Sequence, residues 1–131
     1  MRYDLPALVT LAALLVYVVT AINVGRARGK YKIDAPAVVG HPDFERVYRV
    51  QMNTLEQIVA FLPALWLFAL YVSPVWSAML GAMWILGRIL YAAGYYRAAA
   101  SRGTGFVVTF TAFALLWCGA LWGVGNSLLR A

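Results

Sequence analysis

A row of polar side chains occupies one stretch of an otherwise apolar part of the chain. Arg49, Asn53 and Glu56 are spaced i, i+4 and i+7, so they share one face if residues 44–72 form a helix. A guanidinium suits an anionic, hydrogen-bonding ligand, and a carboxylate suits an amino group on the same ligand. Polar groups are costly inside an apolar span and are commonly functional there. This face is therefore a candidate ligand site.

A second face of the same kind is expected in residues 75–100. Arg88, Tyr91 and Tyr95 are spaced i, i+3 and i+7, and Arg102 would continue the row if the helix ran on to it. Both rows are expected near the same membrane surface, because one begins its span and the other ends the next. We expect them to face a bundle interior, a subunit interface or a water-filled cleft.

Ion pairing within the bundle is the alternative explanation for these charges. Arg49 with Glu56, or Glu56 with Arg88, would form such a pair. The whole set has more cations than acids, because Arg28 and Arg102 add to the arginines while Glu56 is the one acid among them. The surplus favours an anionic ligand.

The composition predicts that these rows are carried by membrane helices. The chain has 131 residues, of which 63% are hydrophobic and 12% charged, against about 45–50% and 25% in soluble domains. A spanning helix needs about 20 apolar residues. We therefore predict an all-α, integral membrane four-helix bundle in a single domain, residues 1–131, with spans at 5–24, 44–72, 75–100 and 105–128.

Local signals predict where the helices begin and end. Asp4 is the expected N-cap of the first span. Residues 25–43 are rich in glycine and proline, which predicts a connection that is not continuous helix. Gly103 is expected to stop a helix and Thr104 to cap the next one.

Three other residues invite a structural interpretation. Pro63 is expected to kink the second span or to free a carbonyl. His41 has no histidine or cysteine partner near it, so we expect it to be solvated and expect no metal site. Cys118 is interpreted as a packing residue.

The net charge of +6 has a membrane explanation. Basic residues concentrate in the connection after the first span and in the turn after the third, whereas the opposite side has Arg2 and Arg130. The positive-inside rule then places both basic connections in the cytoplasm and both termini outside. We prefer this explanation to nucleic-acid binding and expect no nucleic-acid partner.

Three motifs resemble a known family. FERVYRVQMNTLE at 44–56, FLPALW at 61–66 and GRILYAAGYYRAAASR at 87–102 are similar to the MAPEG family, the membrane-associated proteins in eicosanoid and glutathione metabolism. The similarity is greatest to the branch with leukotriene C4 synthase and microsomal glutathione transferases two and three. The resemblance implies a four-helix subunit, a homotrimer, and a glutathione site between neighbouring subunits on the cytoplasmic side.

The resemblance also implies roles for individual residues. The positions that match glutathione contacts are Arg28, Arg49, Gln51, Asn53, Glu56, Tyr91 and Tyr95. Arg102 matches the arginine that stabilises the glutathione thiolate, and a guanidinium lowers the pKa of a nearby thiol. Arg88 matches an arginine of the third helix with a structural or supporting role. The motif departs from the leukotriene branch at Gln57, Ile58 and Val59 and has Gly29 after Arg28, so a leukotriene substrate does not follow.

The function implied is a glutathione transferase of detoxification type, with glutathione as co-substrate and a hydrophobic electrophile or lipid as second substrate. Glutathione-dependent peroxidase activity is a further expectation. The alternatives are a non-catalytic lipid-binding protein of the same family, which lacks matches to Arg49 and Arg102, and a glutathione-dependent isomerase. Short alanine-rich spans and no ER-retention tail favour a bacterial inner membrane over the endoplasmic reticulum.

Overall fold

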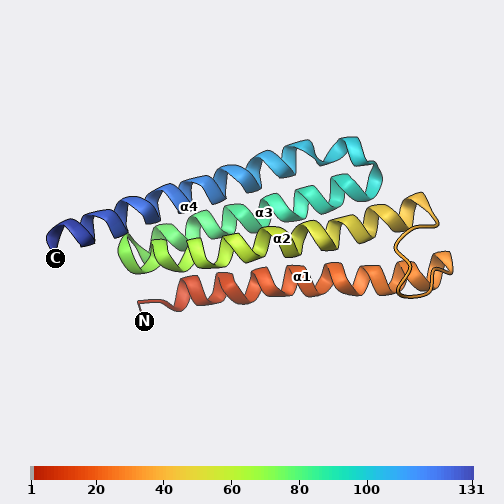
Figure 1. Ribbon diagram of the computed structural model, residues 1–131, viewed down its shortest axis with the longest axis horizontal. Coiled ribbons are helices and arrows are strands. Elements are labelled where there is room, and N and C mark those ends of the chain that lie inside the picture. The colour runs from red at the N-terminus through yellow and green to blue at the C-terminus, as the bar shows by residue number, and fades with distance from the viewer. Residues whose placement is uncertain (1) are drawn as a thin grey trace.

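Four long helices make up the protein. The structure, a computed structural model, describes residues 2–131. The helices lie side by side, with α1 and α4 on opposite sides of α2 and α3 (Figure 1). Both termini lie at one end, and the α1–α2 connection and the turn before α4 lie at the other. The elements are α1 (Asp4–Tyr31), α2 (Pro42–Tyr71), α3 (Pro74–Arg97), the 3₁₀ turn η1 (Ala99–Arg102) and α4 (Gly103–Arg130).

The surface of the bundle is suited to lipid. Within the described residues, four helices are long and apolar enough to cross a membrane. Large apolar side chains cover the outside, and Leu8, Leu11 and Trp122 are each more than 60% exposed. Apolar surface on this scale is stable in a bilayer and not in water. The predicted all-α, multi-pass membrane fold is therefore confirmed.

Aromatic packing fixes the position of α2 against α3. Phe61 and Trp84 are fully buried, and their rings stack with centroids 4.0 Å apart and planes 2° from parallel. Leu65 and Leu116 belong to the same buried cluster, which joins α2 to α4 as well. α2 continues through Pro63 as one helix. The aromatic core therefore lies along α2 and α3, the two helices that also carry the polar rows.

The first helix is longer than the sequence predicted. The expectation of a non-helical connection from residue 25 is wrong, since α1 continues to Tyr31 and ends at Lys32 with a left-handed φ of 56°. Gly25 and Gly29 are tolerated because each costs only about 1 kcal/mol in a helix interior. The extension carries several basic residues beyond the apolar span on a rigid element.

Two predicted helix starts are also wrong. Asp4 is the first residue of α1, and the N-cap position belongs to Tyr3, which makes no side-chain cap. Gly103 does not stop a helix and Thr104 does not cap one, because η1 leads directly into α4 at Gly103. The break after α3 comes earlier, where Ala98 takes an extended conformation.

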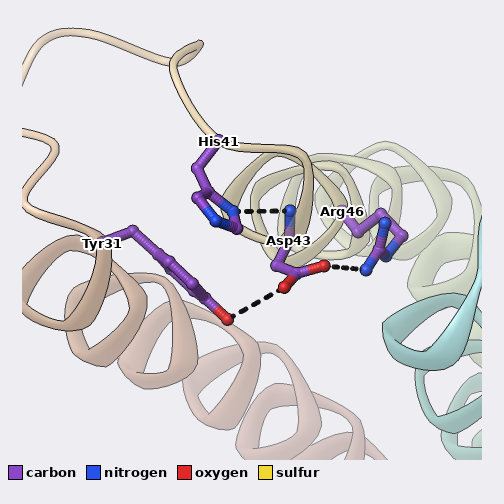
Figure 2. A network of polar contacts seen from close by, with 4 residues as sticks. All are labelled: Tyr31, His41, Asp43 and Arg46. Atoms are coloured by element: carbon purple, nitrogen blue, oxygen red, sulfur yellow. Dashed lines mark hydrogen bonds and ion pairs between the residues drawn. The ribbon is translucent and has the colours of Figure 1, made fainter.

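A network of polar contacts connects the end of α1 to the start of α2 (Figure 2). The ring of His41 accepts a hydrogen bond from the N–H of Asp43 at 3.1 Å. The same ring stacks on that of Tyr31, with the ring centroids 4.2 Å apart. The hydroxyl of Tyr31 donates to the carboxylate of Asp43 at 3.3 Å, and Arg46 pairs with the same carboxylate. His41 is thus the N-cap of α2, and the expectation of a merely solvated histidine is wrong.

Candidate functional site

Six of the residues predicted for a site gather in one pocket. The pocket has a volume of about 330 Å³. It lies where α2, α3 and η1 meet, and a seventh residue, Met52, lines it as well. Met52 was not predicted, although its i+3 spacing from Arg49 places it on the same face of α2. The six predicted residues are Arg49, Asn53, Glu56, Tyr91, Tyr95 and Arg102.

Two tyrosines and an arginine form one wall of this pocket. Tyr91 is 4% exposed, and its ring centroid lies 5.6 Å from that of Tyr95. The guanidinium of Arg102 lies 5.4 Å from the Tyr95 ring centroid and donates to the carbonyl of Ala99 at 3.0 Å. Because α3 ends at Arg97, the turn η1, and not a continued helix, brings Arg102 to the pocket.

Arg88 is buried behind the pocket and contacts two residues that line it, Asn53 and Tyr91. The residue is 1% exposed, and its Nη1 donates to Oδ1 of Asn53 at 2.9 Å. Its Nη2 donates to the hydroxyl of Thr54 at 2.7 Å, and its guanidinium carbon lies 4.3 Å from the Tyr91 ring centroid. Its hydrogen-bond partners in the described chain are neutral oxygens, so Arg88 does not form the ion pair with Glu56 that was considered as an alternative.

Glycines allow α3 to approach the segments that follow it. A Cβ on Gly105 of α4 would overlap the backbone of Tyr91, and a Cβ on Gly94 would overlap the carbonyl of Ser101. Both contacts are with backbone, which cannot move aside as a flexible side chain can. These two glycines therefore set the positions of Tyr91 and of the turn that carries Arg102.

Two of the predicted residues, Arg28 and Gln51, do not line this pocket. Arg28 donates from Nη1 to the carbonyls of Ala37 at 2.7 Å and Ile33 at 3.3 Å, and its guanidinium lies 5.1 Å from the ring centroid of Phe44. Gln51 follows Arg49 by two residues, about 200° around the helix. Its side chain is therefore on a different face of α2 from the pocket.

The pocket carries a net positive charge and opens outward. Arg49, Arg102 and Glu56 are exposed side chains. No ion pair joins Glu56 to Arg49 or to Arg88 in the part of the chain that the structure describes. These charges remain available to a ligand with anionic groups and an amino group. Residues 2–131 contain no group of histidine, cysteine and acidic side chains that could hold a metal ion.

The fold and the pocket define a class of protein, a multi-pass helical membrane protein with a cationic, tyrosine-lined site at one end of the bundle. Comparison of the sequence with known families gives a specific assignment. The MAPEG family model matches residues 6–122. The chain belongs to the MAPEG family.

Proteins with similar sequences are consistent with the assignment to this family. An uncharacterized protein of Synechocystis is 57% identical over 116 residues, which cover 88% of this chain and 85% of the relative. Microsomal glutathione S-transferase 2 of Homo sapiens is 44% identical over 109 residues, 83% of this chain and 74% of the relative. Leukotriene C4 synthase of Cavia porcellus is 36% identical over 96 residues, 73% of this chain and 64% of the relative. The family and these names support a glutathione-utilising membrane enzyme.

Proposed function

We propose that the protein is a membrane-bound glutathione transferase that conjugates glutathione to hydrophobic electrophiles. One observation carries the proposal: the pocket gathers Arg49, Asn53, Glu56, Tyr91, Tyr95 and Arg102 at one end of the bundle. Glutathione is a small anion with carboxylates, an amino group and a thiol, and the pocket offers complementary groups for each. The names of the transferase relatives support the same reaction.

The pocket residues divide into binding groups and an activating group. Arg49 binds a carboxylate of glutathione, Glu56 its amino group, and Asn53 and the tyrosines provide hydrogen bonds. Arg102 stabilises the thiolate electrostatically, since a guanidinium stays protonated and cannot serve as a base. The thiol proton passes to solvent, the sulfur forms a bond to the electrophilic carbon, and the leaving group departs with the bonding electrons.

A homotrimer would complete the site. Arg49 and Glu56 are exposed on the outside of the single subunit, where a neighbouring copy can cover them. Arg28 and Gln51 of that copy would then reach the pocket, which the same residues of the first subunit do not line. The positive-inside rule supports a site on the cytoplasmic side, with the electrophile arriving through the bilayer. The Synechocystis relative supports a bacterial inner membrane.

Conjugation of glutathione to 1-chloro-2,4-dinitrobenzene by the purified protein tests the proposal. In Arg102→Ala we expect turnover to fall by about a hundredfold or more while glutathione still binds, because the lost group acts on the thiolate. In Arg49→Ala we expect calorimetry to show weaker glutathione binding. Arg97→Ala removes an exposed arginine outside the pocket and serves as the control. A wild-type protein that conjugates no electrophile from a broad panel would overturn the proposal.

A further inference from the structure

A second hollow in the bundle is separate from the candidate site. It is an apolar groove of about 390 Å³ between α1 and α3, and it shares no lining residue with the pocket of Arg49 and Arg102. Val16 and Val19 of α1 and Ile89 and Ala92 of α3 are among its lining residues. Arg88, which is 1% exposed and donates to Asn53 of the candidate site, also lines the groove, and the proposed transferase reaction uses no other residue of it.

The groove opens into a basic hollow at the end of α1. This hollow has a volume of about 340 Å³ and is lined by Arg26 and Lys30. It shares two lining residues with the apolar groove, Asn23 and Tyr96, and the amide of Asn23 donates to the hydroxyl of Tyr96 at 3.2 Å. The two hollows therefore adjoin at the Asn23–Tyr96 hydrogen bond, with the apolar one along the span and the cationic one at the end of α1. We call the two together the α1–α3 groove.

The positive charge at this end is not neutralised within the subunit. Neither Arg26 nor Lys30 forms an ion pair with another described residue. Lys30 lies 5.3 Å from the ring centroid of Tyr31, which is a contact with an aromatic face. The first turn of α2 has two acidic side chains, Asp43 and Glu45. Asp43 is occupied by Tyr31 and Arg46 (Figure 2), and Glu45 forms no ion pair with Arg26 or Lys30 in the described chain.

We propose that the α1–α3 groove binds one anionic phospholipid, with its phosphate at Arg26 and Lys30 and an acyl chain along α1 and α3. The lining of α1 from Leu15 to Asn23 is about 12 Å long, enough for much of an acyl chain. Basic pockets between membrane helices are suited to lipid phosphates. A neutral lipid would leave the cations unmatched, and a soluble anion would leave the apolar part unfilled.

The charge requirement is tested by native mass spectrometry of the full chain, purified and delipidated, with equal amounts of phosphatidylglycerol and phosphatidylcholine. We expect phosphatidylglycerol adducts to dominate. In the double variant Arg26→Gln, Lys30→Gln the preference should fall by roughly 10- to 30-fold. The control is Lys32→Gln, Arg97→Gln, which removes two exposed cations at the same end that do not line the groove, and it should keep the preference.

The apolar requirement is tested with neighbouring valines on α1. Val19 lines the groove and Val18 does not, although they are 46% and 47% exposed. We expect Val19→Trp to fill the groove and remove the phosphatidylglycerol adduct, and Val18→Trp to retain it. Size-exclusion profiles and thermal midpoints of both variants confirm that each remains folded.

The remaining outcomes decide against the proposal. Equal retention of phosphatidylcholine and phosphatidylglycerol by the wild type would show that charge does not select the occupant. Displacement of the adduct by soluble glycerol phosphate would identify a simple anion site. Equal loss in Val18→Trp and Val19→Trp would show that the lipid does not lie between α1 and α3.

Discussion

Arg88 is a buried cation that the described chain balances without an acid. Moving a charge out of water is costly, and hydrogen bonds must offset that cost. Asn53 and Thr54 accept two of its donors, while its Nε has no partner in the described chain. The guanidinium also lies over the Tyr91 ring. Two residues of the candidate site, Asn53 and Tyr91, therefore depend on one buried side chain.

Substitution of Arg88 by lysine should weaken both the fold and glutathione binding. A single ammonium cannot replace a planar fork that reaches Asn53 and Thr54 together. Loss of a charged hydrogen bond costs about 1.5–3 kcal/mol, so we expect a thermal midpoint several degrees lower and glutathione affinity reduced by roughly tenfold. Scanning calorimetry measures the thermal midpoint and titration calorimetry measures the glutathione affinity. Arg97→Lys, at an exposed arginine, is the control. Wild-type affinity in Arg88→Lys would contradict a positioning role.

Spacing alone predicted which residues share a face, but not which residues they bind. The 3.6-residue repeat was sufficient to place Arg49, Asn53 and Glu56 on one face, and all three line one pocket. The partners of Arg88 depend on how α2 and α3 are positioned against each other. The stack of Phe61 on Trp84 helps to set that position, and no periodicity in either helix reveals it.

At the scale of elements, glycine contacts between α3 and α4 set the geometry of the site. Gly105→Ala should lower the thermal midpoint and the rate of conjugation together, because its Cβ would press on the backbone of Tyr91. Overpacking of this kind typically costs about 1–3 kcal/mol. Gly125→Ala is the matched control in the same helix, since nothing lies within 4 Å of its Cβ position. If both variants behaved as wild type, close approach at Gly105 would not position the site.

The start of α2 depends on an unusual cap. His41→Ala should lower the thermal midpoint, because the N–H of Asp43 loses its acceptor and a lost N-cap costs about 1 kcal/mol. His41→Asn supplies another good capping side chain and should recover most of the loss. Thermal melts followed by circular dichroism make the comparison. If Asn melted no higher than Ala, stacking on Tyr31, and not capping, would be the stabilising contact.

Helix boundaries were the least predictable part of the fold. Glycine and proline content indicated a connection from residue 25, yet α1 continues to Tyr31. Single glycines on an exposed helix surface are weak breakers, and the helix ends where Lys32 adopts a left-handed conformation. The presence of four helices long and apolar enough to cross a membrane was predictable, because a bilayer requires about 20 apolar residues in each span.

At the scale of the whole molecule, the open side of the pocket predicts sites shared between copies. If Arg102 acts from one subunit and Gln51 from the next, then Arg102→Ala and Gln51→Ala subunits should complement each other. Mixed 1:1 before assembly, they should regain about a quarter of wild-type conjugation activity, since random assembly gives that share of sites with both residues intact.

Detergent-solubilised protein carrying two different affinity tags provides the mixed oligomers. Tandem purification selects them, and cross-linking reports the number of subunits. Because selection removes the unmixed oligomers, which have no intact site, the expected recovery in a purified trimer rises from about a quarter to about a third. Each variant prepared alone is the baseline, and a mixture of oligomers combined after assembly is the control. Recovery only to the average of the two single variants would place Gln51 outside a shared site. If cross-linking detected only monomers, a site built between copies would be excluded. The pocket of a single chain would then have to bind glutathione unaided.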